Sequence, residues 1–325
     1  MNDYPWYDER VTHLTHELKK LNITEIGSSS TPKEIYQYLD ERVWKQNEAK
    51  KAAAMLMWKA LNGIKENVLF CGPSGCGKTE IWRQLSAVFP DRIAIVDCSA
   101  VSQDAWKGSV KWSDMIESPI FKSNQNTILV MDEADKMMSP KFSSGGENVA
   151  QSVMSEGLKM LEGTIAKVTR NSVTYPVDTN RISFVLLGAF SNKATDIAEQ
   201  NKGPSIGFGA LPDDVKPYTN PLTMQDIIDF GAMPEFVGRI QKIVNLEPML
   251  QTDFYRMLEK RKNGPIQNLE KQYRIKLDLS GRKREELAQN AYESGLGVRQ
   301  LTNQLVKLID DGLFEDPEQK YLEFI

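Results

Sequence analysis

Residues 72–79 are Gly72-Pro73-Ser74-Gly75-Cys76-Gly77-Lys78-Thr79 and fit the pattern G-x-x-x-x-G-K-[ST]. They follow the apolar run Asn67–Cys71, and a helical pattern begins at Thr79. A strand, a glycine-rich turn and a helix in this order predict a P-loop, in which backbone N–H groups surround phosphate oxygens. We therefore expect this stretch to bind ATP, with Lys78 at the β- and γ-phosphates and the Thr79 hydroxyl on Mg²⁺.

An acidic motif lies downstream of this loop, where the apolar run Ile128–Met131 leads into Asp132 and Glu133. Acidic residues after a strand are usually solvated, but beside a P-loop they indicate hydrolysis. One carboxylate, Asp132, is then expected close to Mg²⁺, and Glu133 is expected to polarise the attacking water.

Around these motifs, short β-branched apolar runs alternate with helical patterns, which predicts an α/β fold with a mainly parallel sheet covered by helices. The expected strands are Asn67–Cys71, Arg92–Asp97, Thr127–Met131, Ile182–Gly188 and Lys242–Leu246. The expected helices between them are Gln46–Leu61, Thr79–Val88 and Val149–Leu161. Three parts are predicted: an N-terminal extension (1–33) with a polar helix around Glu9–Leu21, a large α/β domain (34–246) and a smaller, mostly helical domain (247–325). The last should contain helices at Thr252–Lys262, Pro265–Tyr273, Arg282–Ser294 and Val298–Leu313, and a short strand at Ile275–Leu279.

Composition excludes several classes of protein. The 325 residues are 41% hydrophobic and 26% charged, as in an ordinary globular protein. The longest apolar runs are far shorter than the roughly 18 residues of a membrane span, so no membrane partner is expected. Three cysteines without paired spacing predict neither disulfides nor a zinc site, and favour a reducing cytoplasm. The net charge of −4 gives no overall electrostatic reason to bind a nucleic acid, so no nucleic-acid partner is expected.

Several segments in order resemble the AAA+ superfamily and, within it, the ClpX unfoldase family. The segment Val43-Trp44-Lys45-Gln46 is similar to the family's V-I-G-Q stretch, and Gly188-Ala189-Phe190 ends a strand as in the family. The box Pro234-Glu235-Phe236-Val237-Gly238-Arg239 is similar to P-E-F-[IV]-G-R, and Gly297-Val298-Arg299 stands at the family's G-A-R. The resemblance covers about residues 32–313 and implies the AAA+ fold.

The resemblance also implies roles for residues outside the two motifs. Val43 and Trp44 are expected at the adenine of ATP. Arg239 is expected to reach the nucleotide of a neighbouring subunit, as an arginine finger that stabilises the transferred phosphoryl group. Arg299 is expected to touch the phosphates from the second domain, so that the angle between the domains responds to the γ-phosphate. The chain is accordingly expected to form a hexameric ring.

Two further segments bear on partners. Ala105-Trp106-Lys107-Gly108 occupies the place of the family's pore loop, where an aromatic side chain grips a protein substrate, although Lys107 replaces a hydrophobic residue. Ser143–Val149 resembles the second pore loop. Ile206-Gly207-Phe208 lies in a polar insertion and matches the I-G-F tip that docks on the ClpP peptidase.

The chain departs from the family in two places. The short segment Met1–Ser30 stands where the family has a four-cysteine zinc-binding domain, and the basic R-K-H loop is absent from the compact stretch between Gly163 and Asn180. Three functions stay open on these grounds: an unfoldase that feeds a separate ClpP-like peptidase, a peptidase-independent remodeller of one protein complex, and, ranked last, a nucleic-acid-linked ATPase.

Overall fold

The computed structural model describes residues 26–99, 111–142, 145–170, 172–200, 218, 220–259 and 264–325. The helix expected around Glu9–Leu21 lies outside these residues.

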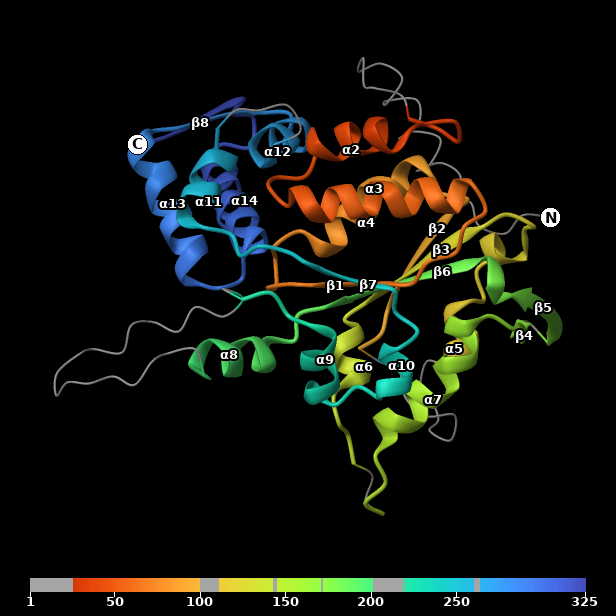
Figure 1. Ribbon diagram of the computed structural model, residues 1–325. Coiled ribbons are helices and arrows are strands. Elements are labelled where there is room, and N and C mark those ends of the chain that lie inside the picture. Colours follow the sequence, from red (N-terminus) through yellow and green to blue (C-terminus); the bar gives the residue numbers. More distant parts are fainter. Residues whose placement is uncertain are drawn as a thin grey trace, which may run out of the picture.

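A parallel sheet of five strands, in the order β2-β3-β6-β1-β7, forms the centre of the molecule (Figure 1). Its strands are β1 (Val68–Cys71), β2 (Ile93–Asp97), β3 (Thr127–Asp132), β6 (Ile182–Gly188) and β7 (Lys242–Asn245). β1 pairs with β6 on one side and β7 on the other, with Cys71 opposite Gly188 and Asn245. The strands expected from the sequence are therefore confirmed, and the α/β fold class with them.

Helices cover both faces of the sheet. Side chains alternate across a strand, so the apolar strands present side chains to both faces and both must be buried. In β1, Val68 and Phe70 belong to one buried cluster, and Leu69 and Cys71 to the other. The helices over the first face are α2 (Pro32–Asp40), α3 (Asn47–Leu61) and α4 (Lys78–Val88). The second face packs on α5 (Trp112–Met115), α6 (Ala134–Met138), α7 (Val149–Glu162), α9 (Met224–Phe230) and α10 (Pro234–Val237), while α8 (Ser191–Gln200) follows β6.

The C-terminal part is mostly helical and joins the first of these clusters. It contains α11 (Gln251–Met257), α12 (Pro265–Tyr273), β8 (Lys276–Leu279), α13 (Gly281–Glu293), α14 (Val298–Glu315) and β9 (Tyr321–Phe324). The expected elements are present, but α11 ends at Met257 rather than at Lys262. The strand β9, which pairs in parallel with β8, was not expected from the sequence. A four-residue strand of this kind is stabilised by a distant partner rather than by local pattern.

A second difference lies between Gly163 and Asn180, where the sequence predicted only a compact stretch. The structure has an antiparallel hairpin of β4 (Ile165–Arg170) and β5 (Val173–Asp178), followed by the short 3₁₀ turn η2 (Thr179–Arg181). The hairpin contacts the segment before a second such turn, η1 (Pro119–Lys122). There the Tyr175 hydroxyl of β5 donates to the carbonyl of Glu117 at 2.9 Å. The hairpin lies at the amino end of β6, opposite the edge from which α8 leaves (Figure 1). Among the described residues, no helix combines the length and apolar character that a membrane crossing requires.

Candidate functional site

The P-loop connects β1 to α4 at the carboxyl edge of the sheet. Gly75 and Gly77 have φ values of 72° and 104°, which favour glycine, and Gly77 is the N-cap of α4. The Lys78 ammonium folds over the loop and donates to the carbonyls of Gly72 at 2.6 Å and Pro73 at 2.8 Å. The loop therefore has the backbone form and the cation that a phosphate group needs.

Beside the loop, the Thr79 hydroxyl donates to the Asp132 carboxylate at 2.8 Å. Asp132 ends β3, which is separated from β1 by β6, so the two motifs meet because parallel strands end at one edge. A hydroxyl and a carboxylate in contact fit Mg²⁺, which prefers oxygen ligands and bridges a protein to phosphates. ATP and Mg²⁺ thus fit the residues that the two motifs bring together.

Glu133 directly follows Asp132 and is exposed at this edge. Its φ of 55° is unusual for a residue with a Cβ, and its N–H donates to the Asp132 carboxylate at 3.0 Å. Backbone strain of this kind persists only where the surroundings enforce it and concentrates at functional sites. The next acidic residue, Asp135, is buried and accepts a hydrogen bond from the Phe190 N–H at 3.3 Å, which connects α6 to the end of β6.

The segment before α3 links the P-loop to the C-terminal part. Val43 is buried beside Gly77, and the Trp44 indole donates to Asp253 of α11 at 3.4 Å. The Gln46 side chain donates to the carbonyls of Cys76 at 3.2 Å and Glu247 at 2.8 Å, and accepts from the Glu247 N–H at 2.9 Å. This amide therefore holds the phosphate loop and the start of the C-terminal part together.

The start of α14 touches the P-loop directly. The Val298 N–H donates to the Gly75 carbonyl at 3.4 Å. A Cβ on Gly75 would lie 2.5 Å from the Leu296 carbonyl oxygen, and one on Gly297 would lie 2.8 Å from the Cα of Gly75, so both positions need glycine. Arg299, in the first turn of α14, is exposed beside this contact.

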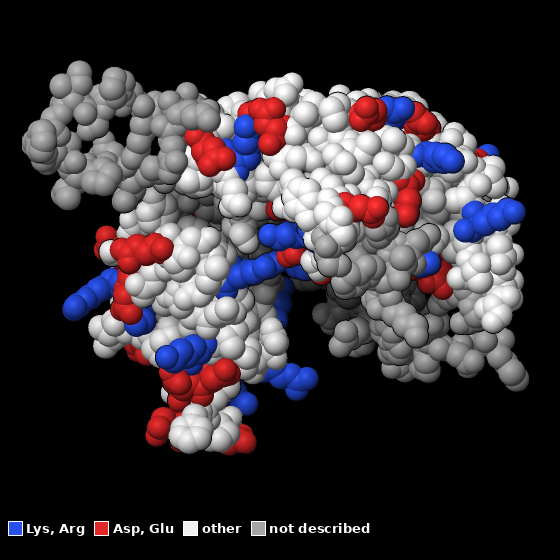
Figure 2. Space-filling view, turned by 90° about the horizontal axis from the view of Figure 1, so that it is seen from below, with Lys and Arg blue, Asp and Glu red and all other residues white. Residues whose placement is uncertain are grey.

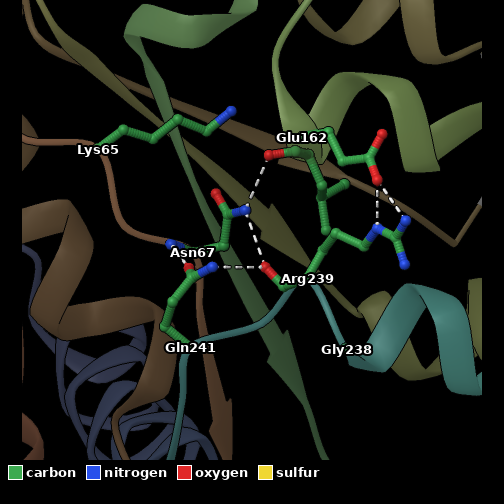
Figure 3. A pocket seen from close by; sticks show the side chains of 7 residues that line it. Lys65, Asn67, Glu162, Gly238, Arg239 and Gln241 are labelled. Atoms are coloured by element: carbon green, nitrogen blue, oxygen red, sulfur yellow. Dashed lines mark hydrogen bonds and ion pairs between the residues drawn. The ribbon is translucent and has the colours of Figure 1, made fainter.

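Arg239 lies at the opposite edge of the sheet, before the first residue of β7. Because β7 runs parallel to β1, the length of the strand, roughly 13 Å, separates Arg239 from the edge that carries the P-loop. The Arg239 side chain pairs with Glu162, the last residue of α7, and lines a pocket of about 340 Å³ (Figure 3). Its guanidinium is thus remote from the phosphate loop of its own chain.

Comparison with known proteins now places the chain in a family. The profile of the AAA domain (Cdc48 subfamily) matches residues 64–243, more than half of the chain. The chain belongs to the AAA family. This AAA protein is also similar to the ClpX ATP-binding subunit of the ATP-dependent Clp protease from Treponema denticola, at 29% identity over 90% of this chain and 79% of that protein.

Other ClpX subunits show the same similarity. That of Borrelia duttonii is 28% identical over 90% of this chain and 76% of its own, and ClpX 2 of Wolinella succinogenes is 29% identical over 89% and 78%. The resemblance to ClpX stated from the sequence motifs is therefore confirmed.

Some predicted residues of this AAA protein fall outside the described ranges. They are Trp106 and Lys107 of the first pore loop, Ser143 and Ser144 of the second, and Ile206, Gly207 and Phe208 of the docking tip. Other residues at the site were missed as site residues by the sequence analysis, namely Gln46, Asn67, Asp135 and Glu162. A polar residue at the start of a buried strand could have drawn attention to Asn67, but Glu162 is an ordinary helical glutamate in sequence.

Proposed function

We propose that this AAA protein is an ATP-driven protein unfoldase that works as a ring, in which each ATP site is completed by a neighbouring copy. The observation that carries the proposal is the separation between the two halves of the chemistry. The phosphate loop, Thr79 and Asp132 meet at the carboxyl edge of the sheet, whereas Arg239 lies at the amino edge. One chain cannot bring both to the same phosphate, but two neighbouring copies can.

Within one chain, the proposed roles follow from position and chemistry. Lys78 and the P-loop N–H groups bind the phosphates, Thr79 and Asp132 hold Mg²⁺, and Glu133 orients and polarises the attacking water. Bound Mg·ATP supplies the phosphoryl group and the charge that these residues stabilise. Arg239 of the adjacent copy adds a positive charge where negative charge develops, an effect worth about 10³–10⁵ in rate for such fingers.

Coupling to movement is proposed to pass through the C-terminal part. The start of α14 lies against the P-loop, with Arg299 in its first turn, and Gln46 joins the loop to Glu247. A change at the phosphates therefore acts on the position of the C-terminal helices. In a ring this movement is expected to draw Trp106 and Lys107 along a protein substrate.

The relatives are ATP-binding subunits of a protease, and we extend that partnership to this chain. The proposed contact is the tip Ile206-Gly207-Phe208 docking on a ClpP-like peptidase. A protein substrate suits the surface better than a nucleic acid, because Lys and Arg are interspersed with Asp and Glu on the face seen in Figure 2. The reducing cytoplasm is the compartment expected for this assembly.

The ring is tested by mixing two inactive variants. Glu133→Gln keeps the finger but hydrolyses ATP slowly, and Arg239→Ala keeps a complete phosphate loop but has no finger. Each variant alone is expected to lose roughly 10³-fold in hydrolysis, and a mixture should recover activity because the first chain lends its arginine to the second. A mixture that stays as inactive as its components, or Arg239→Ala chains that hydrolyse normally, would overturn the proposal.

The peptidase partnership is tested by deleting Ile206–Phe208. We expect unchanged ATP hydrolysis and unchanged unfolding of a tagged model protein, but loss of degradation when a ClpP-type peptidase is added. As a control, a deletion of equal length, Asn201–Gly203, should keep degradation. Degradation that survives the loss of the tip would show that the tip is not the contact, and no degradation by the unaltered protein would favour the peptidase-independent remodeller instead.

A further inference from the structure

The Arg239 guanidinium is held on one side by its own subunit. Its Nε donates to Glu162 Oε1 at 2.8 Å, its Nη2 donates to the same oxygen, and its Nη1 donates to the Glu235 carbonyl at 2.7 Å. Figure 3 shows the guanidinium directed at the Glu162 carboxylate from the end of α7. All three nitrogen atoms of the guanidinium are thus bonded, to the Glu162 carboxylate of α7 and to the Glu235 carbonyl of α10.

The backbone of the same residue is fixed independently. The carbonyl of Arg239 accepts from Asn67 Nδ2 at 3.0 Å and from Gln241 Nε2 at 3.1 Å. Asn67 is 2% exposed and also donates to the Leu161 carbonyl at 3.1 Å, one residue before Glu162. Asn67 therefore joins the backbone of Arg239 to the end of the helix that carries its carboxylate partner, Glu162 (Figure 3).

The contacts with Glu162 and Glu235 leave some N–H donors of the Arg239 side chain available to a ligand. An arginine has five N–H groups, one on Nε and two on each terminal nitrogen. Glu162 and the Glu235 carbonyl take three of them, so each terminal nitrogen keeps one N–H without a partner among the described residues. Two N–H donors on one planar guanidinium can pair with the oxygens of a phosphate.

We propose that Glu162 is a positioning residue for Arg239: it holds the side of the guanidinium so that the two remaining N–H groups face the nucleotide of the neighbouring copy. This inference rests on the proposed function, since it assigns a purpose to the orientation of the finger. The finger arrives already oriented, so it loses little side-chain freedom when the phosphate is engaged.

Two observations separate this role from a structural one. The side chains of Arg239 and Glu162 are 33% and 50% exposed, and exposed ion pairs contribute little to stability. Both guanidinium bonds to Glu162 end on the single atom Oε1. An amide oxygen can accept the same two bonds, so Glu162→Gln should keep the orientation while Glu162→Ala loses it.

The test uses the mixture of Glu133→Gln chains, which donate the finger, and Arg239→Ala chains, which bind the ATP that is hydrolysed. Glu162→Ala is added either to the donor or to the acceptor. On the donor it should lower the recovered kcat about 10-fold or more, because a misplaced catalytic group is costly. On the acceptor, whose finger is absent, the rate should stay within about twofold. Glu162→Gln on the donor should retain most of the kcat.

A matched control is Glu286→Ala on the donor, which removes a glutamate with 52% side-chain exposure from its ion pair with Lys283 and should leave the rate unchanged. Equal losses whichever chain carries Glu162→Ala, or no loss on the donor, would overturn the inference and leave the shared ATP site intact. A parent mixture that recovers no hydrolysis would overturn the proposed function, and the inference with it.

Discussion

At the scale of single residues, the phosphate loop combines groups that are exposed to a ligand with groups that are sealed from water. Ser74 is exposed, whereas Cys76, two residues later, is 3% exposed. Burial raises the pKa of the Cys76 thiol, and burial raises the pKa values of Cys71 and Cys98 as well. The three thiols of this chain therefore stay protonated in the folded protein, and only thiolates are strongly nucleophilic.

This gives a prediction for alkylation. At pH 8 we expect iodoacetamide to label the three cysteines in denaturant within minutes and to leave them unlabelled in the native protein, as measured by intact-mass spectrometry. The sign of the pH dependence follows, since an unfolded thiol ionises above about pH 8.5 while the folded thiol keeps its proton. Stability should therefore fall as the pH rises through 9. Rapid labelling of Cys76 in the native protein would contradict the burial of its thiol in the phosphate loop.

At the scale of helices and strands, one buried amide joins elements that are far apart in sequence. Asn67 precedes β1, and its side chain bonds to the end of α7, to the Arg239 carbonyl and, through Oδ1, to the Phe184 N–H of β6 at 3.1 Å. Buried polar groups that lose a partner cost about 1–3 kcal/mol each. The position of Arg239 relative to the sheet therefore depends on this side chain.

Asn67→Ala should lower the free energy of unfolding by about 3 kcal/mol, because the Leu161 carbonyl and the Phe184 N–H lose the bond to Asn67 and the Arg239 carbonyl keeps only the bond from Gln241. Chemical denaturation followed by fluorescence measures the change. The control is Asn62→Ala, which removes an exposed amide that bonds only to the Trp58 carbonyl of its own helix. That variant should change the free energy of unfolding by less than about 0.5 kcal/mol. Similar losses in both variants would argue against a special role of Asn67 in joining these elements.

At the scale of the whole molecule, the P-loop is joined to the C-terminal part by a short connecting segment. Lys45 pairs with Glu247 and Asp253, each at 3.2 Å, and the buried Gln46 bonds to both Cys76 and Glu247. The P-loop and the C-terminal helices therefore share one set of hydrogen bonds. These contacts are the route by which we propose that a change in the loop reaches the helices that begin after Glu247.

Gln46→Ala is expected to weaken this connection without touching the phosphates. Because the Cys76 carbonyl and both backbone groups of Glu247 lose a partner, the Kd for a fluorescent ATP analogue should rise about 10-fold, equivalent to about 1.4 kcal/mol. Gln289→Ala, which removes an exposed amide paired with Glu293 on α13, is the control and should bind nucleotide normally. An unchanged Kd in Gln46→Ala would show that nucleotide binding at the P-loop does not depend on its connection to the C-terminal part.

Local residue patterns were enough to locate the P-loop at 72–79, the Asp132-Glu133 pair, the sheet strands and the helices α3, α4, α7 and α11 to α14. These features depend on glycine at special backbone angles and on hydrophobic periodicity, which are properties of neighbouring residues. The helices α2, α5, α6, α8, α9 and α10 were not predicted. The β4–β5 hairpin, β9 and the early end of α11 were not predicted, because their stability comes from partners distant in sequence. Only folding brings Thr79 to Asp132 and Glu162 to Arg239, since such contacts are fixed by which strands and helices become neighbours in the packed molecule.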